Sequence, residues 1–395
     1  MTHPASRDVL SPVLERLPGA ARRALARSPW ATGALRDVAA MVRSWTTPRP
    51  PFQLIGRDGA ALPGERRLKV LEVRRETPDA VSLFVERPAG VRELAGQFLT
   101  FTLSIDGAEV RRSYSLSSAP DEPCWRVTVK RVAGGSGSTH LTERVRAGDT
   151  LRTRGPSGDF TLDPDALPGH LLLIGGGSGV TPLFALAKAA LTADAGARVT
   201  MLIGDRRGVD CLFAEEIDEL ARAHDGLRVV RVLESSGSVE SPRRIDEADL
   251  DDALARGTLH EARVYVCGPE PLMDLVVHAL GRRGVGGAQV KTERFVTVRA
   301  PAADRLPSTP VTLRVGGREA PVAPGQTLLE AATAAEIPLE FSCTMGGCGA
   351  CVMRLVDGDV AMAEPNCLDD DERRRRLVLT CVSRPLTDVT LEPDD

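Results

Sequence analysis

The 395-residue sequence contains no run of eighteen or more apolar residues, so it predicts no transmembrane helix. Its first residues lack the continuous apolar segment of a secretory signal peptide. The formal net charge is only −4, which argues against a general nucleic-acid-binding protein. The hydrophobic fraction of 42% is sufficient for packed cores, and the length predicts two to four domains.

Four of the eight cysteines follow a demanding spacing. Cys343, Cys348 and Cys351 stand at C-x4-C-x2-C spacing, and Cys381 follows at a distance. This is the plant-type ligand pattern of a [2Fe–2S] cluster, in which each iron takes two thiolates. Glycines between the cysteines let the backbone approach the inorganic sulfides and adopt positive φ. Those glycines are Gly346, Gly347 and Gly349.

The alternative for these four cysteines is a purely structural role. The remaining cysteines are scattered along the chain, unlike the dense framework of a small secreted protein, and a reducing cytoplasm is therefore expected. They are Cys124, Cys211, Cys267 and Cys367.

Composition divides the chain into segments. Residues 1–64 predict a helical, basic extension that ends in a proline-rich connector, and residues 65–166 predict an antiparallel β-barrel. Residues 167–300 alternate apolar strands with helical patterns, which is typical of a parallel α/β sheet. Residues 301–308 read as a linker, and residues 309–395 open with a strand and a Gly-Gly turn, followed by a helix from about Thr327 to Ala335.

Charge differs between the two ends of the chain. Residues 1–64 contain nine Lys or Arg and four Asp or Glu, whereas residues 309–395 contain eight and fifteen. A basic extension beside an acidic C-terminal domain could steer a redox partner. The alternative is ordinary solvated surface.

The segment Arg112-Ser113-Tyr114-Ser115 follows a strand pattern in the barrel region. It resembles the R-x-Y-S/T signature of the ferredoxin–NADP⁺ reductase superfamily. The resemblance implies that Arg112 pairs with a flavin phosphate through its planar guanidinium. It also implies that Tyr114 packs on the isoalloxazine ring and that Ser115 hydrogen-bonds near flavin N5. A four-residue match can also arise by chance.

A second element strengthens this resemblance: Val129-Lys130-Arg131 and the glycine-rich stretch 134–139. By resemblance, Ser138 and Thr139 bind the flavin pyrophosphate, and Gly135 and Gly137 permit close approach. A flexible turn is the alternative. Relatives often place a histidine where Thr142 stands here. The later segment Gly155-Pro-Ser-Gly-Asp-Phe160 favours FAD over FMN.

The nicotinamide site is suggested by a strand that runs into Gly175-Gly-Gly-Ser-Gly-Val-Thr-Pro182 and then into a helical pattern. Free amides at a helix N-terminus bind phosphate, and proline is tolerated there because its missing amide would be unpaired. The turn resembles the superfamily's G-x-G-x-T-P motif, in which Thr181 lies by the nicotinamide. The residues so assigned are Gly176, Gly177, Gly179, Thr181 and Pro182.

The companion motif is Cys267-Gly268-Pro269, which by resemblance lies where nicotinamide C4 meets flavin N5. Cys267 would position the nicotinamide; the alternative is an inert buried cysteine. Glu293-Arg294-Phe295 resembles the family's final Glu-x-Phe region, with Phe295 near the flavin. Ser115, Thr181 and Cys267 are thus the predicted catalytic residues.

The coenzyme, NADPH or NADH, is left open by the residues after the next strand. Arg206 or Arg207 could pair with a 2′-phosphate, whereas Asp205 could accept from a free 2′-hydroxyl. NADPH is slightly favoured, and these residues could equally be surface charges.

The resemblance implies three modules in order: a flavin β-barrel, a nicotinamide α/β domain and a β-grasp ferredoxin domain. This order resembles the reductase components of phenylacetyl-CoA epoxidase and 3-ketosteroid 9α-hydroxylase. It implies an NAD(P)H-dependent reductase that passes single electrons through FAD and a [2Fe–2S] cluster to a separate oxygenase, hydroxylase or desaturase. The alternatives are a diaphorase that reduces a small acceptor such as a quinone, and a redox-sensing binding protein.

The N-terminal extension has an apolar helical face formed by Leu35, Val38, Met41, Val42 and Trp45. Three interpretations stay open for residues 1–45: peripheral contact with the inner face of the membrane, docking to a soluble oxygenase, or packing on the reductase itself. A cytoplasmic protein is expected in each case.

Overall fold

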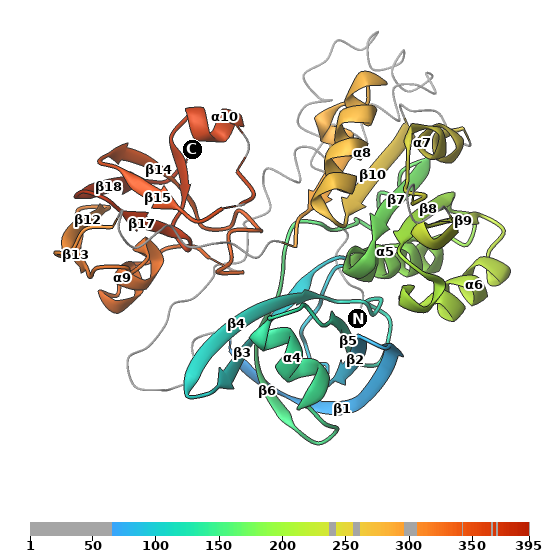
Figure 1. Cartoon of the computed structure of the whole chain (residues 1–395), viewed down its shortest axis with the longest axis horizontal. Coiled ribbons are helices and arrows are strands. Elements are labelled where there is room, and N and C mark those ends of the chain that lie inside the picture. The colour runs from blue at the N-terminus through green and yellow to red at the C-terminus, as the bar shows by residue number, and fades with distance from the viewer. Residues whose placement is uncertain are drawn as a thin grey trace, which may run out of the picture. The chain divides into compact units, whose positions relative to one another are not determined.

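The computed structural model describes residues 65–236, 242–255, 261–295, 306–341, 343–364, 366–368 and 370–394. They belong to one compact unit, Leu54–Asp395. The helical extension predicted over residues 1–64 lies outside the described residues. Within the described ranges, no helix is both long enough and apolar enough to cross a membrane. Figure 1 shows the chain coloured along its length.

The first module is a six-stranded antiparallel sheet in the order β4-β3-β6-β1-β2-β5. The long first strand pairs with β6 through its beginning and with β2 through its later part. An antiparallel bridge between Leu116 and Val127 joins the two outer strands and closes the sheet into a barrel. Its elements are β1 (Arg66–Thr77), β2 (Ala80–Val85), β3 (Phe98–Ile105), β4 (Ala108–Ser115), β5 (Trp125–Lys130), α4 (Ser136–Glu143) and β6 (Thr150–Ser157).

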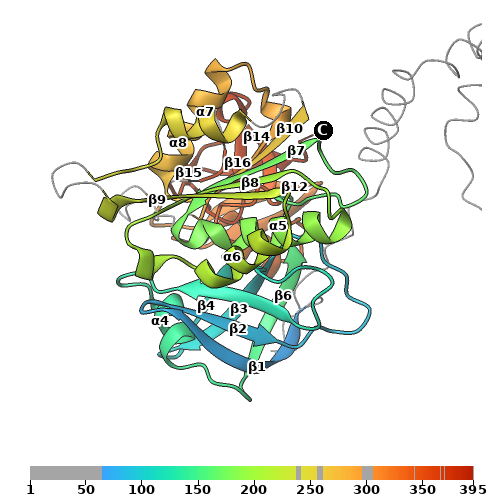
Figure 2. The same cartoon turned by 90° about the vertical axis from the view of Figure 1, so that its right-hand side faces the viewer.

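The second module is a five-stranded parallel sheet in the order β11-β10-β7-β8-β9. Its strands are β7 (His170–Gly176), β8 (Val199–Asp205), β9 (Leu227–Leu233), β10 (Ala262–Cys267) and β11 (Val290–Glu293). Its helices are α5 (Val180–Ala193), α6 (Ala214–Ala223), α7 (Glu247–Leu254) and α8 (Glu270–Arg282), and short 3₁₀ turns include η1 (Gly177–Gly179) and η2 (Gly208–Asp210). Figure 2 shows α5 and α6 on one face of the sheet and α7 and α8 on the other.

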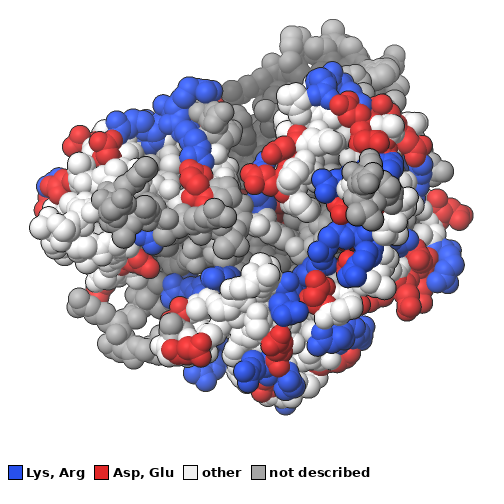
Figure 3. All heavy atoms as spheres, viewed as in Figure 1, with Lys and Arg blue, Asp and Glu red and all other residues white. Residues whose placement is uncertain are grey.

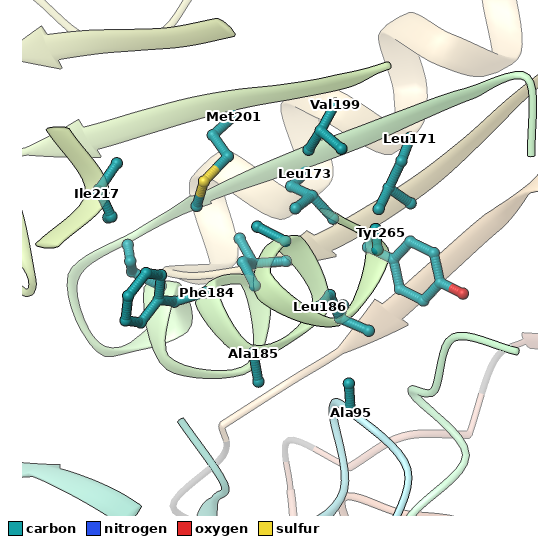
Figure 4. Packing of buried hydrophobic residues seen from close by; sticks show 14 of the residues in the cluster. Ala95, Leu171, Leu173, Phe184, Ala185, Leu186, Val199, Met201, Ile217 and Tyr265 are labelled. Atoms are coloured by element: carbon teal, nitrogen blue, oxygen red, sulfur yellow. The ribbon is translucent and has the colours of Figure 1, made fainter. Parts of the chain in front are cut away.

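Alternating residues of β7 serve these two faces. Leu171 and Leu173 belong to the core on the α5 side, whereas Leu172 and Ile174 belong to the core on the α8 side. Figure 4 shows Leu171 and Leu173 on one side of α5, and Ala95 of the barrel module on its other side. Helix α5 is therefore buried between the parallel sheet and the barrel module.

The third module has a five-stranded sheet in the order β13-β12-β18-β14-β16 and a separate pair, β15 and β17. Thr327 caps its first helix through a reciprocal capping box with Glu330, which explains why the helix begins there. The elements are β12 (Val311–Val315), β13 (Arg318–Val322), α9 (Leu328–Ala334), β14 (Val352–Asp357), β15 (Val360–Met362), α10 (Asp370–Arg374), β16 (Leu377–Leu379), β17 (Ser383–Pro385) and β18 (Val389–Glu392). The predicted fold class of barrel, parallel α/β sheet and ferredoxin-type domain is confirmed.

Candidate functional site

The two predicted flavin motifs lie against each other in the barrel module. A Cβ added at Gly137, in the first turn of α4, would stand 2.8 Å from Cγ of Arg112 on β4. Glycine therefore provides the space in which the arginine lies over the helix start. The first turn of α4 contains no acidic residue, so amides and guanidinium together offer positive charge. This arrangement fits a bound phosphate group.

Other side chains of these motifs have structural tasks. The Ser138 hydroxyl donates to Gly135 O at 3.2 Å and accepts from Val132 N at 3.1 Å, so it shapes the loop itself. Ser113 Oγ lies 2.8 Å from Thr100 Oγ1, and Val129 is buried in the barrel core. These residues can contact a flavin through their backbone atoms, and their side chains hold the shape of the loop and strands that would surround it.

The remaining flavin-motif residues are distributed around this centre. The Tyr114 ring is tilted against Phe101 at a centroid distance of 6.1 Å, and burial raises the pKa of Tyr114 to about 12. Lys130 Nζ lies 3.6 Å from Asp79 Oδ1. The Thr139 amide donates to Gly135 O at 3.0 Å as α4 begins.

The turn after β7 needs glycine because neighbouring main-chain atoms leave no room for a side chain. A Cβ added at Gly179 would stand 2.0 Å from the carbonyl oxygen of Cys267, and one at Gly175 would stand 2.3 Å from the same atom. A Cβ at Gly176 would stand 2.3 Å from Gly204 O. The G-x-G-x-T-P turn and the Cys-Gly-Pro turn are thus in direct main-chain contact at the carboxyl ends of β7 and β10.

Side chains around this turn hold it in place. Thr181 is buried, and its hydroxyl donates to Ser178 O at 2.8 Å. Pro182 lies in the first turn of α5, while Gly268 and Pro269 lead from β10 into α8. The Gly177 amide donates to Asp205 Oδ1 at 3.2 Å. Asp205 is therefore committed to the turn and is only 8% exposed, which argues against its predicted role as a ribose acceptor.

The two arginines after Asp205 differ in how tightly their guanidinium groups are paired. Arg207 donates from Nε and Nη2 to the two oxygens of Asp210, both at 2.9 Å. Arg206 reaches the same carboxylate only at 3.9 Å, and its side chain is 65% exposed. Arg206 is thus the guanidinium more available to a ligand phosphate.

Three side chains from different modules and strands meet beside these turns. Ser115 Oγ, at the end of β4, donates to Glu293 Oε2 at 3.1 Å. Glu293 ends β11 and is paired in register with Cys267 of β10. Burial raises the pKa of Glu293 to about 8 and that of Cys267 well above its usual range. A half-buried carboxyl group that stays neutral below about pH 8 therefore lies where the flavin and nicotinamide motifs converge.

Sequence reasoning placed Glu293 in a motif but did not include it among the catalytic residues. Its partner Ser115 is 178 positions away, so local patterns could not have shown the contact. A Glu at the end of the last parallel strand was the available signal. Phe295, two residues further on, is 46% exposed.

The four predicted ligand cysteines of the third module lie in two pairs. Cys343 N–H donates to the sulfur of Cys348 at 3.5 Å, and the sulfurs of Cys351 and Cys381 are 3.2 Å apart. Met345 N–H donates to the Cys343 sulfur at 3.3 Å, as amides around a thiolate-bound cluster do. Gly346 and Gly349 have φ of 72°, which fits the expected tight loop. These two cysteine pairs, with three cysteines on the loop and Cys381 beside it, fit the four ligands of a [2Fe–2S] cluster.

Comparison with known proteins finds a related family for each of the three modules. Three family models match the chain: the oxidoreductase FAD-binding domain over residues 78–162, the oxidoreductase NAD-binding domain over 173–278 and the 2Fe-2S iron-sulfur cluster binding domain over 311–386. The class is therefore a flavin- and nicotinamide-dependent oxidoreductase with a C-terminal ferredoxin domain.

Most of the chain is similar to nearly the full length of known reductase components. It is 34% identical over 343 residues to the ferredoxin reductase component of 3-ketosteroid-9-alpha-monooxygenase from Rhodococcus rhodochrous, covering 81% of this chain and 94% of that protein. It is 31% identical to one of the subunits of 1,2-phenylacetyl-CoA epoxidase from Escherichia coli, covering 83% and 97%. The solved structure of phthalate dioxygenase reductase matches with a TM-score of 0.61 at 25% identity, covering 84% and 98%. The chain belongs to the family of reductase components of multicomponent oxygenases, within the ferredoxin–NADP⁺ reductase superfamily.

Proposed function

We propose that this reductase takes hydride from NADPH, holds the electrons on FAD and passes them one at a time through its [2Fe–2S] cluster to a separate oxygenase component. The observation that carries the proposal is the junction of Ser115, Glu293 and Cys267, where the motifs of two modules meet. The bound cofactors supply the redox chemistry, and the protein supplies position and electrostatics.

At the flavin site, Arg112 and the start of α4 would hold the phosphates. Arg112 lies directly over Gly137, and this contact supports the assignment. Ser115 would orient the reactive edge of the flavin, because its hydroxyl lies at the module junction. Gly175 and Gly179 have no room for a side chain beside Cys267, and the turn that they form would bring the nicotinamide to the module junction. Cys343, Cys348, Cys351 and Cys381 would be the cluster ligands.

NADPH is favoured over NADH by the residues that follow β8. The Asp205 carboxylate binds the Gly177 amide within the turn, and Arg207 is held by Asp210. Arg206 is exposed and could bind a 2′-phosphate. The module boundaries proposed from the sequence are kept as part of this proposal: breaks at residues 64/65 and 166/167, and a linker over residues 301–308.

The electron acceptor would be an oxygenase, hydroxylase or desaturase, since the relatives are named as components of monooxygenase and epoxidase systems. We place the reaction in the cytoplasm, in keeping with the reduced cysteines among the described residues. The basic, amphipathic residues 1–45 would bring the reductase to a membrane-bound partner. Liposome binding by the full chain, but not by a chain that begins at Glu65, would support this role; equal binding would contradict it.

The reductase assignment is tested with a cluster-less variant. Cys381→Ser should lose iron and sulfide but keep NADPH-dependent reduction of ferricyanide, because the flavin site is in other modules. It should lose reduction of cytochrome c, used here as a one-electron protein acceptor. Cys124→Ser, which changes a cysteine of the barrel module, is the control and should keep both activities. If the loss of the cluster leaves both reductions unchanged, a diaphorase that acts directly from the flavin becomes the better description.

A further inference from the structure

A short segment of the third module lies against the predicted cluster loop. The Cys367 amide donates to Gly346 O at 2.9 Å, and the Ala363 amide donates to Val382 O at 3.0 Å. Cβ of Asn366 would stand 3.3 Å from a Cβ added at Gly346. The segment formed by Ala363, Glu364 and Asn366–Leu368, here called the bracing segment, thus contacts both the three-cysteine loop and the residue after Cys381.

One arginine holds the bracing segment together. Arg373 of α10 donates from Nη1 to Glu364 Oε1 at 2.6 Å and from Nη2 to Glu364 Oε2 at 3.2 Å. It also donates from Nη2 to Asn366 Oδ1 at 2.9 Å and from Nε to Leu368 O at 3.2 Å. The planar guanidinium therefore binds three residues of the segment at once, which an ammonium group cannot reproduce.

The next arginine on the same helix has no such role. Arg374 pairs with Asp371 at 3.1 Å, and both side chains are at least 70% exposed. The Arg373 side chain is 32% exposed. Figure 3 shows Lys and Arg side chains gathered over α10, so exposed charge alone does not distinguish Arg373. Its contacts do.

The bracing segment reaches the predicted cluster site through Gly346. This residue has φ of 72°, its carbonyl accepts from the Cys367 amide, and the amide of the preceding Met345 donates to the sulfur of Cys343 at 3.3 Å. Holding the Gly346 carbonyl therefore also holds the adjoining Met345 amide beside the Cys343 sulfur. Hydrogen bonds to cluster sulfurs and exclusion of solvent both tune the reduction potential of an iron–sulfur cluster.

We propose that Arg373 is a positioning residue for the [2Fe–2S] cluster. It acts through Glu364, Asn366 and Cys367 to hold Gly346 and, with it, the Met345 amide that donates to the Cys343 sulfur. The guanidinium thereby sets the reduction potential of the cluster and slows its loss. The inference rests on the proposed ligand role of the four cysteines.

The test compares Arg373→Lys with Arg374→Lys in the full-length holoprotein. Both substitutions keep the charge, so a purely electrostatic role for Arg373 predicts no change in either. Loss of the fork at Arg373 should make the cluster potential more negative, because the amide hydrogen bond that stabilises the reduced cluster weakens. Cluster loss to a chelator should accelerate about tenfold, as for other residues that support metal ligands. Arg374→Lys should match the unsubstituted protein.

Two further measurements keep the proposal falsifiable. Glu364→Gln keeps Arg373 but removes the charge of its carboxylate partner, so it should also accelerate cluster loss. This variant remains informative if Arg373→Lys does not assemble a cluster. Hydrogen exchange of the Cys367 amide should be faster in Arg373→Lys than in Arg374→Lys. Equal potentials, loss rates and exchange in the two lysine variants would overturn the inference. Unsubstituted protein that holds no cluster would instead refute the ligand assignment.

Discussion

The hydroxyl of Ser115 donates a 3.1 Å hydrogen bond to Glu293, which joins the end of a barrel strand to the end of the last parallel strand. The two residues belong to the modules with the flavin and nicotinamide motifs. Glu293 is half-buried, and its neighbour in the adjacent strand is Cys267. The junction therefore couples the two halves of the proposed hydride-transfer site through one carboxyl group.

Glu293 should give NADPH-driven flavin reduction a pH dependence. Burial raises its pKa to about 8, so the group is neutral below that pH. Ionisation above it places a negative charge where hydride, also negative, must arrive. In stopped-flow measurements the rate should fall as the pH rises through about 8, and Glu293→Gln should remove this fall. Glu270→Gln, at an exposed carboxyl, is the control; a Glu293→Gln profile identical to it would contradict the assignment.

The Glu293 carboxyl should also make the stability of the fold depend on pH between 4.5 and about 8. Between pH 4.5 and about 8 the folded chain keeps a proton that the unfolded chain has lost. The contribution of Glu293 to the free energy of unfolding therefore falls as pH rises through this window, by at most about 1.4 kcal/mol for each pH unit. Glu293→Gln should show a flatter dependence of the melting temperature on pH.

Gly179→Ala should abolish NADPH-dependent reduction of the flavin. The new Cβ would stand 2.0 Å from Cys267 O, and a main-chain atom cannot rotate away as a side chain can. The barrel module should still bind flavin, so the visible flavin spectrum should be retained. Gly281→Ala in α8, where an added Cβ meets nothing within 4 Å, is the matched control. Normal turnover by Gly179→Ala would show that the turn does not bind the coenzyme as proposed.

Arg206→Ala and Arg207→Ala should differ in their effect on coenzyme choice. Arg206 is the freer guanidinium, so its loss should raise KM for NADPH about tenfold or more and leave KM for NADH unchanged, consistent with a charge-assisted contact worth about 1.5–3 kcal/mol. Arg207 is paired with Asp210, and its loss should affect both coenzymes similarly. Equal effects of Arg206→Ala on both KM values would remove the reason to favour NADPH.

Arg126 should be a major contributor to stability. It is 2% exposed, pairs with Glu76 at 2.8 Å and with Glu216 of α6 at 2.7 Å, and lies over the Phe213 ring at 4.5 Å. Arg126→Ala leaves Glu76 buried without its partner and should cost about 3–5 kcal/mol. Arg131→Ala, at an exposed 3.6 Å pair with Glu143, should cost less than about 1 kcal/mol. Similar melting temperatures for the two variants would contradict this account.

Much of the fold follows from local patterns. The apolar runs at 171–174 and 199–203 lie in the parallel sheet, and the capping box at Thr327 begins a helix where the sequence predicted one. Short apolar runs flanked by glycine turns are strong indicators of buried strands, because the hydrophobic pattern and the turn residues both predict the same element. The order of strand, glycine turn and helix around Gly175–Pro182 was also predicted, though not the contact of this turn with Cys267.

The details of the site depend on distant partners. Asp205 was a candidate ribose ligand by its position after β8, but the Gly177 amide binds its carboxylate. Arg207 was equivalent to Arg206 in sequence, and only its pairing with Asp210 separates them. The contact of Ser115 with Glu293 joins two modules. Such choices are decided by tertiary packing, which no local pattern contains.

The central claim is an intramolecular chain from nicotinamide to flavin to cluster. The most direct test is an anaerobic titration of the purified holoprotein with NADPH, repeated with NADH, followed by visible absorption. The account predicts that the flavin and cluster bands both bleach, and at lower concentration with NADPH. Bleaching of the flavin alone, with a fully assembled cluster left oxidised, would contradict it.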